Sequence, residues 1–286
     1  MRASITSEQQ KQYCRFVEDG GTKALEQVDL DKDGLQRLLG RGGEFQKVIV
    51  SAIRELSADV EGEAQAFWEK VWEEILGRKV EIPPLSKLSG KTAEAVKKYG
   101  FRVMYLPTIT EEDYPTDFVK PVWGKYLDES LIERKPLIPP LASGGITGQW
   151  VAVETIAKPH WDDPAGYGND LLGKTLGFDS RFRKSWDELK SHLPKAGKLI
   201  SAKEVRFLTV EEWNLVGNLF LWLNRHRGAL LPDLGSTRSW EWCENAFGSE
   251  SRLLVGLVGR GGLADVDGHW HVEASGTVGF RVLAVL

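Results

Sequence analysis

The stretch Ser239–Leu286 reads SWEWCENAFGSESRLLVGLVGRGGLADVDGHWHVEASGTVGFRVLAVL. Three of its segments, Trp240–Trp242, Leu253–Val258 and Val278–Leu286, are bulky and rich in residues that favour strands. Small, polar, glycine-containing segments separate them. Short apolar runs broken by glycine are typical of strands joined by turns, not of helices. The stretch therefore predicts a β-meander, and we expect the rest of the chain to support it.

The residues just upstream alternate between predicted strands and predicted helices. Gln149–Ile156 and Glu204–Leu208 are predicted strands. Ser185 and Thr209 each precede a glutamate by three positions, which is the capping-box pattern of a helix start. A helix is predicted from Val210 to His226, with its large apolar residues on one face. Strands and helices followed by a meander predict an α+β domain.

The N-terminal part of the chain is expected to be mainly helical. The paired prolines and glycines of Leu137–Gly145 favour a boundary between the two parts. We therefore predict a helical region with a short extended segment over residues 1–140 and a second domain over residues 141–286. Helices are predicted at residues 9–18, 44–56, 63–76 and 92–99, and an extended segment at residues 101–107.

The composition is that of an ordinary globular protein. Apolar residues make up 42% of the 286 residues and charged residues 27%, which argues against disorder. The net charge of −4 does not suggest a nucleic-acid partner. Nine of the eleven tryptophans lie at or after Trp123, which predicts an aromatic core or binding surface in the C-terminal half.

The two cysteines and the absence of long apolar runs limit the cellular settings that we expect. Cys14 and Cys243 lie in different halves and form no CxxC motif, so neither a disulfide framework nor a zinc module is predicted. The N-terminus lacks the apolar centre of a signal peptide, and no run is long enough to span a bilayer. By default, this predicts a cytoplasmic or virion-associated protein.

Two segments imitate known ligand-binding loops. Asp29–Gly34 begins like a calcium-binding EF-hand loop, but the twelfth position, which requires a bidentate acid, is Gly40. We interpret it as an acidic turn before a helix that begins near Leu35. Gly259–Gly262 resembles a phosphate-binding loop but lacks the Lys-Ser/Thr ending and a following helix. We expect its glycines to serve tight turns.

Two possible catalytic or metal sites remain open as alternatives. On a strand, His269 and His271 would share one face, and Asp265, Asp267 or Glu273 could supply a third metal ligand. The spacing is not diagnostic, and we expect neither a metal nor a cofactor. Cys243 could be a nucleophile, with His226 or His269 as its base, although a cysteine among aromatic residues is more often buried and inert.

Four motifs, in order, resemble those of formylglycine-generating-enzyme-type domains, a branch of the C-type lectin fold. Arg206–Trp213 resembles their Arg-Leu-Pro-Thr-x-x-Glu-Trp signature, with Phe207 and Leu208 in place of Leu-Pro. Trp240–Trp242 resembles their Trp-Glu-Trp, and Gly259–Gly262 their Arg-Gly-Gly turn. Gly279–Arg281 resembles their terminal Gly-Phe-Arg. The resemblance covers about residues 145–286, roughly half of the chain.

The resemblance favours a non-enzymatic branch of this family. The catalytic members use two nearby cysteines, whereas this half contains only Cys243. The C-terminal stretch resembles the variable region of diversity-generating-retroelement variable proteins, in which adenine-directed mutagenesis rewrites displayed residues on a fixed scaffold. Asparagine codons in such templates cannot become Trp or Glu, so Glu250, Trp270 and Glu273 would be fixed or differently encoded.

The resemblance implies which residues form the binding surface and which hold it. The expected core residues are Trp240, Trp242, Leu254, Phe280 and Val282. Phe247 and Trp270 are expected contacts because large aromatic side chains dominate interfaces. The complete expected ligand-binding set is Asn245, Phe247, Ser249, Ser251, Leu257, Val258, Arg260, Asp265, Asp267, His269, Trp270, His271 and Ser275.

Three functions follow as hypotheses. The first is non-enzymatic recognition of a protein or other macromolecule, which predicts that substitutions at Phe247, Asp265 or His269 are tolerated. The second is an enzyme of the formylglycine-generating-enzyme superfamily, with metal assistance through His269 and His271. The third is a phage-like structural or attachment component that assembles through its helical N-terminal region.

Overall fold

The computed structural model describes residues 62–110, 112–123, 146–163, 166–259 and 261–286. It also describes eight residues nearer the N-terminus, Lys11, Cys14, Arg15, Glu18, Asp33, Gln36, Gly40 and Arg41. The chain divides into two compact units, Met1–Arg54 and Glu55–Leu286. The predicted helices at residues 9–18 and 44–56 and the predicted boundary at residue 140 lie wholly or largely outside the described residues. The following description concerns the second unit.

The second unit begins with two helices and a strand, α4 (Gly62–Leu76), α5 (Gly90–Lys98) and β1 (Phe101–Leu106), which confirms the elements predicted over residues 63–107. The predicted apolar stripe of α4 is buried, with Trp68, Val71 and Trp72 at most 2% exposed. The indole nitrogen of Trp72 donates a hydrogen bond to the carbonyl oxygen of Tyr105 at 2.7 Å. This bond ties α4 to β1.

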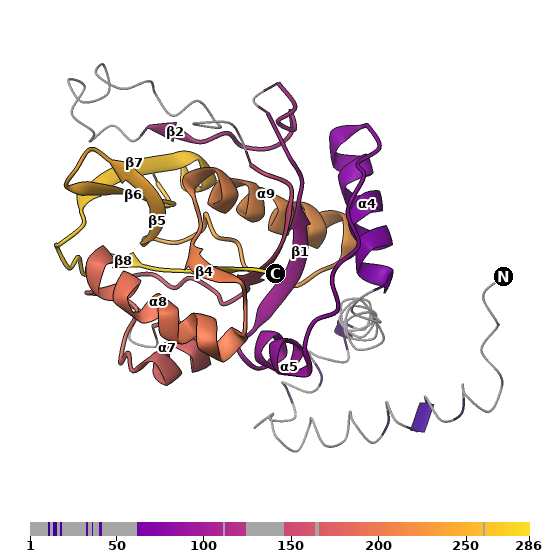
Figure 1. Ribbon diagram of the computed structural model, residues 1–286, viewed down its shortest axis with the longest axis horizontal. Coiled ribbons are helices and arrows are strands. Elements are labelled where there is room, and N and C mark those ends of the chain that lie inside the picture. Colours follow the sequence, from indigo (N-terminus) through magenta and orange to yellow (C-terminus); the bar gives the residue numbers. More distant parts are fainter. Residues whose placement is uncertain are drawn as a thin grey trace. The chain divides into compact units, whose positions relative to one another are not determined.

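Four antiparallel strands form one sheet in the order β1-β3-β9-β4 (Figure 1). Besides β1, the sheet contains β3 (Gln149–Glu154), β9 (Val282–Val285) and β4 (Glu204–Phe207). The last strand of the chain therefore lies inside the sheet, between β3 and β4. Strands from either side of residue 140 share this sheet, because β1 pairs with β3 along its whole length.

The second sheet has five strands in the order β2-β7-β6-β5-β8. Its centre is an antiparallel meander of β5 (Trp240–Phe247), β6 (Ser251–Val255) and β7 (Asp265–Trp270), which confirms the predicted meander. The short strands β2 (Val122–Trp123) and β8 (Val278–Gly279) pair in parallel with β7 and β5.

Two parts of the predicted meander are corrected. The third strand, β7, comes from the polar segment DVDGHW and not from an apolar run. The apolar run Val278–Leu286 does not continue the meander, because it breaks at Phe280 and Arg281 between β8 and β9. It therefore links the two sheets.

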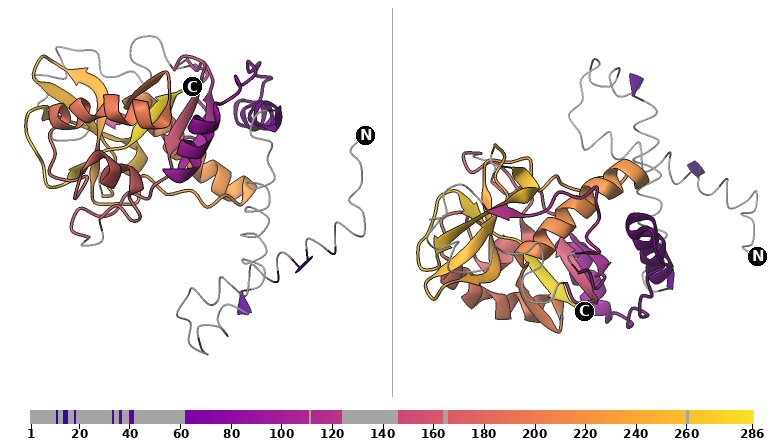
Figure 2. Two further views of the ribbon diagram at one scale, coloured as in Figure 1. Left: turned by 60° about the horizontal axis from the view of Figure 1, so that its bottom comes forward. Right: turned by 90° about the horizontal axis from the view of Figure 1, so that it is seen from above.

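Three further helices, α7 (Leu171–Leu176), α8 (Trp186–Ile200) and α9 (Val210–Arg227), complete the α+β unit together with the 3-10 turn Gly262–Ala264. Thr209 and Glu212 form the predicted reciprocal capping box at the start of α9. Ser185 caps α8 by accepting from the amide of Glu188, but the Glu188 carboxylate pairs with Lys184 at 2.9 Å and does not return to the cap. Figure 2 shows α9 extending from the sheets toward α4, where Arg227 pairs with Glu74.

Two hydrophobic clusters form the core. One contains residues of α4, β1, α9 and the α9-facing side of the meander. The other contains residues of α5, α7, α8 and the opposite side of the meander. The five predicted core residues, Trp240, Trp242, Leu254, Phe280 and Val282, all lie in the second cluster, which confirms their assignment.

Candidate functional site

Three of the four sequence motifs meet at the buried carboxylate of Glu241, the centre of the Trp-Glu-Trp segment. Arg281, from the Gly-Phe-Arg segment, places its guanidinium against this carboxylate at 3.1 and 3.2 Å. The indole nitrogen of Trp213, the last residue of the Arg206–Trp213 motif, donates to it at 2.6 Å. The hydroxyl of Tyr167 donates to it at 3.0 Å. The motifs therefore serve a shared scaffold contact.

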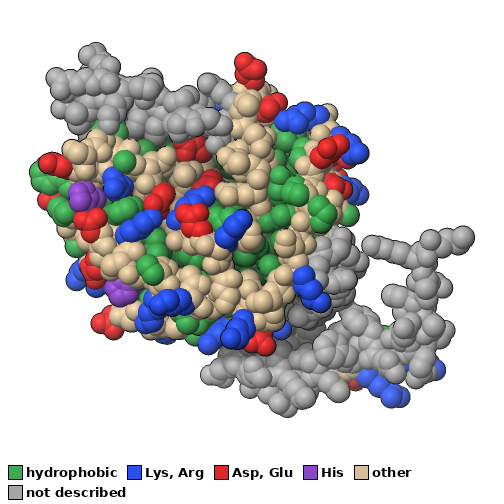
Figure 3. Space-filling model, viewed as in Figure 1, with side chains coloured by type: hydrophobic (Ala, Val, Ile, Leu, Met, Phe, Trp, Pro, Cys, Tyr) green, Lys and Arg blue, Asp and Glu red, His purple; other side chains and the backbone are tan. Residues whose placement is uncertain are grey.

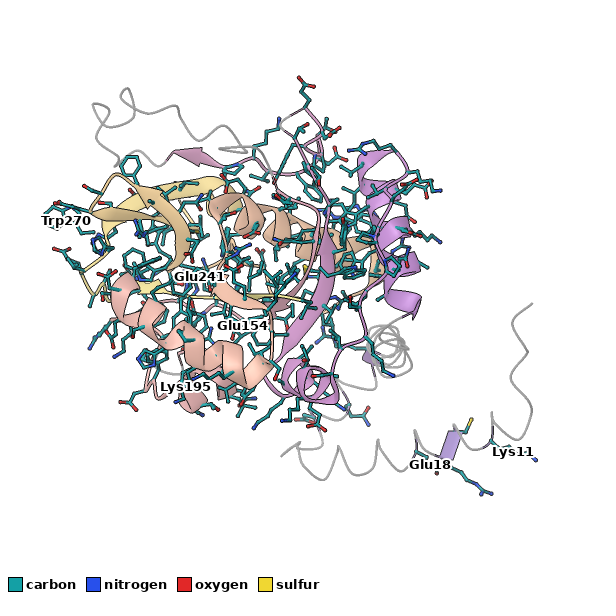
Figure 4. All side chains as sticks on the ribbon, viewed as in Figure 1. Lys11, Glu18, Glu154, Lys195, Glu241 and Trp270 are labelled. Carbon is teal, nitrogen blue, oxygen red and sulfur yellow. The ribbon has the colours of Figure 1, made fainter. Side chains whose placement is uncertain are left out.

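A second buried ionic cluster lies beside the first. Arg181 holds the carboxylate of Glu154 with two hydrogen bonds, at 2.6 and 2.8 Å, and also donates to Asp170. Arg281 connects the clusters, because it donates to the carbonyl oxygen of Glu154 at 2.7 Å. Figure 4 shows Glu154 and Glu241 in the interior, between the sheets. Buried charges of this kind require paired partners, and each has one here.

The charges in these clusters shift the pKa values of their neighbours. Burial alone raises the pKa of Glu241, but the adjacent charges of Arg281 and Lys158 outweigh it and hold that pKa below its ordinary value. Burial lowers the pKa of Arg181, but the carboxylate of Glu154 outweighs it and holds that pKa well above its ordinary value. Glu241 and Arg181 are therefore charged at neutral pH.

Lys158 is the exception among the buried cations. Burial lowers its pKa to about 7, and the neighbouring Glu241 offsets only part of that effect. Its amine donates to the carbonyl oxygens of Ser239 and Gly256 at 2.8 and 2.6 Å and lies 5.2 Å from the centroid of a Trp213 ring. Sequence reasoning missed this residue, because a lone lysine in a loop carries no signal of burial.

The outer ends of the meander form the exposed part of the expected binding surface. We name residues 247–251 and 269–273 the tip surface. The amide of His271 donates to the carbonyl oxygen of Glu250 at 3.0 Å, which joins its two turns. Trp270 is 58% exposed and Val272 65% exposed, and Figure 4 shows Trp270 at the outer margin, far from Glu241. Val272 was not in the expected binding set.

The register of the meander places three expected contacts on one face of the sheet. Phe247 pairs with Ser251, and Ser251 pairs with Trp270. Direct cross-strand partners point to the same side of a sheet, so these three residues form a row across the three strands. Arg252 and His269 form the next row and point to the other side, where Arg252 lies 4.3 Å from the ring centroid of Trp186.

Several expected contacts are instead engaged in the scaffold. The side-chain oxygen of Asn245 accepts from the amide of Val210 at 2.8 Å. The carbonyl oxygen of Ser275 accepts from the amide of Arg183 at 3.0 Å. Asp265 is only 1% exposed, so it lies in the interior and not on the surface where it was expected. Its burial also removes the reason to expect that substitutions there are tolerated.

The remaining expected residues divide by exposure. Ser249 and Val258 are exposed, and Leu257, Asp267, His269 and His271 are partly buried. Arg260 lies outside the described residues.

The two histidines have different carboxylate partners. β7 ends at Trp270, so the alternation on which the metal hypothesis rested stops before His271. His271 pairs with Asp187 at 2.7 Å, whereas His269 lies 3.6 Å from Glu273. Among the described residues, no group of three or more His, Cys, Asp or Glu side chains is arranged to hold a metal ion.

Cys243 is buried on β5 with 0% exposure. Burial, followed by the nearby carboxylates of Glu211 and Glu241, raises its pKa well above the ordinary value. The thiol therefore stays protonated, whereas nucleophilic catalysis requires the thiolate. Its surroundings are those of a structural cysteine.

No protein-family model matches the chain, and no curated protein matches it. None of the described helices is long and apolar enough to cross a membrane.

Proposed function

We propose that this chain is a non-enzymatic recognition protein, in which a scaffold of the C-type lectin type displays a diversified binding surface. The scaffold is of the formylglycine-generating-enzyme type. The partner is a protein or another macromolecule, and the contacts lie on the tip surface. The observation that carries this proposal is the separation of two sets of residues, the motif residues around Glu241 and the exposed residues at the tip.

The motif residues support the proposal through the contacts that they make. Glu241, Arg281 and Trp213 hold the two sheets and α9 together through one buried carboxylate. A surface can change its side chains without loss of the fold only if other residues hold its backbone. The buried network provides that support at a distance from Trp270.

The tip surface supports the proposal through its composition. It presents exposed tryptophan and valine beside serine, histidine and glutamate side chains. Large aromatic and apolar anchors surrounded by small and charged residues are characteristic of protein-binding surfaces. The three-strand row of Phe247, Ser251 and Trp270 gives these side chains a rigid base.

The enzymatic alternative receives less support from the geometry. Its thiol chemistry would need Cys243 as a thiolate, and the burial of that residue opposes ionisation. Its metal-assisted form would need His269 and His271 to converge, and they pair with different carboxylates.

The decisive experiment is to sequence the genomic neighbourhood of the gene. A diversified binder requires a near-repeat of the coding sequence for Ser239–Leu286 beside a reverse transcriptase gene. The two copies should differ mainly at adenines, within the codons of tip residues such as Ser249, Ser251 and His269. If no repeat is present, or if the differences fall on the codons of Glu241 and Arg281, the diversification proposal is wrong.

A further inference from the structure

A groove of about 510 Å³ lies between α8 and β4, on a part of the molecule that the proposed function does not use. Five residues of α8 line it (Lys190, Leu193, Pro194, Gly197 and Lys198), together with residues 202–205. We name this the α8–β4 groove. The groove is open on the α8 side because Gly197 has no side chain. A Cβ at that position would meet only Val205 Cγ2, at 3.9 Å.

One wall of the groove is an open strand edge. The amide of Leu286 donates to the carbonyl oxygen of Trp150, so even-numbered residues of β9 bond toward β3 and odd-numbered residues toward β4. Val205 pairs with Ala284, an even-numbered residue, so the amide and carbonyl of Val205 point away from β9. Phe207 confirms this orientation, because its amide bonds outward to the carboxylate of Glu244 at 3.3 Å.

The open edge is short and bounded. At Leu208 it is closed, because the carbonyl oxygen there accepts from the amide of Glu244 on β5. In the part of the chain that the structure describes, the outward amide of Val205 has no hydrogen-bond partner. The unpaired N–H and C=O of Val205 can therefore form hydrogen bonds with the backbone of one residue of an extended peptide.

The charges that line the groove favour an acidic ligand. The side-chain amines of Lys198 and Lys203 have no hydrogen-bond or ion-pair partner among the described residues, whereas Lys190 pairs with Glu244. The one acidic residue in the lining, Glu204, has Arg206 beside it at 3.8 Å. Lys and Arg side chains gather along the lower side of α8 in Figure 3.

We propose that the α8–β4 groove binds an extended acidic peptide segment of a partner protein, which adds to the edge of β4 at Val205 and pairs its carboxylates with Lys198 and Lys203. A peptide fits better than a nucleic acid for two reasons. The amide and carbonyl of Val205 can form backbone hydrogen bonds with a peptide strand, and a phosphodiester chain cannot complete these bonds. In addition, among the residues that the structure describes, no aromatic side chain lines the groove on which bases could stack.

Selection from a random octapeptide display library on the full-length protein tests this proposal. The selected peptides should be enriched in Asp and Glu and in residues that favour extended structure. Their affinity, measured by fluorescence anisotropy, should fall as the salt concentration rises. A selection without enrichment of acidic residues, or an oligothymidylate that competes as well as the peptides do, would overturn the proposal.

Substitutions in the groove then locate the binding. Gly197→Leu fills the groove from α8 and replaces a poor helix former with a good one, so the protein should fold at least as well while peptide affinity falls at least tenfold. Ser191→Leu, on the same helix outside the groove lining, is the matched control and should leave the affinity unchanged. Equal affinities for Gly197→Leu and wild type would contradict the proposal.

Two more variants separate backbone pairing from charge. Val205→Pro removes the outward amide without touching the bonds to β9 and should weaken binding at least tenfold, whereas Val205→Thr keeps that amide and should not. The double variant K198E/K203E should also lose at least tenfold, and the exposed Lys174→Glu on α7 should lose nothing. If both K198E/K203E and Val205→Pro fold and bind peptide normally, the groove is not the site.

Discussion

A single carboxylate, Glu241, explains why short motifs far apart in the sequence occur together in this chain. Its partners Trp213, Arg281 and Tyr167 lie 28, 40 and 74 positions away. All of them are buried, so each must satisfy its polar atoms within the protein. Loss of Glu241 would leave all three without their shared acceptor.

Glu241→Gln should therefore destabilise the protein strongly. The substitution leaves the Arg281 guanidinium buried without its counter-charge, and breaking a buried pair in this way costs about 3–5 kcal/mol. Denaturant unfolding measures the change in the free energy of unfolding. Glu244→Gln is the matched control on the same strand, because Glu244 pairs with Lys190 near the surface and its loss should cost about 1 kcal/mol or less. Equal costs for the two variants would contradict the central role of Glu241.

Lys158 should make stability depend on pH in the alkaline range. Its pKa is lowered to about 7 in the folded protein from the ordinary 10.5, so between these values the unfolded chain binds more protons than the folded one. Stability from this group therefore rises with pH, by up to about 1.4 kcal/mol per pH unit. Unfolding free energies should show this rise when measured from about pH 6, roughly one unit below the lowered pKa, to about pH 10, just short of the ordinary pKa. The substitution Lys158→Met should remove the rise. A slope that persists in Lys158→Met would assign the effect to another group.

Sequence reasoning could not predict these buried ion pairs. Glu241 and Arg281 could be named from the motifs, but Lys158, Glu154 and Arg181 have no local pattern that marks them. Their burial depends on partners that only the folded chain brings together, such as Glu154 with Arg181 27 positions away. The same reason explains Asp265, which was expected on the surface and is buried.

At the scale of elements, local patterns predicted helices well because a helix satisfies its own backbone. α9 begins at the predicted Thr209 cap and ends within one residue of the predicted end. Strands were harder, because their partners decide them. The polar segment of β7 is a strand because every residue of β6 pairs with it. The terminal apolar run splits because β8 and β9 join different sheets.

The cap of α9 should contribute more to stability than the cap of α8. Thr209→Ala removes the part-buried bond from the amide of Glu212 to the Thr209 hydroxyl at the start of a mostly buried helix, and loss of an N-cap costs about 0.5–2 kcal/mol. Ser185→Ala removes a one-way cap, because Glu188 is engaged with Lys184. Thermal unfolding of both variants should give the lower midpoint for Thr209→Ala. The reverse order would mean that the burial of the Thr209 cap, compared with the exposed cap at Ser185, does not raise the cost of its loss.

At the scale of the whole unit, stability and display are located in different places. The ion pairs are buried, and the two hydrophobic clusters pack the sheets and the inner halves of β5 and β6 against the helices, α4 and α9 in one cluster and α5, α7 and α8 in the other. The tip surface extends beyond them and ends on Trp270 and Val272. The outer strand ends are joined to the interior through backbone pairing, which does not depend on side-chain identity, and also through side-chain contacts such as that of His269 with Trp242.

This separation predicts that the tip surface tolerates simultaneous change. Replacing Ser249, Trp270 and Val272 together with alanine should alter the free energy of unfolding by no more than about 0.5 kcal/mol per site, because exposed side chains contribute little to stability. Trp242→Ala removes a side chain that is 1% exposed, on the same meander, and should cost about 3–5 kcal/mol. Denaturant unfolding of the triple variant and of Trp242→Ala compares the two regions directly. If the triple variant unfolds as readily as Trp242→Ala, the tip residues support the fold, and a surface that must remain constant cannot be the diversified one.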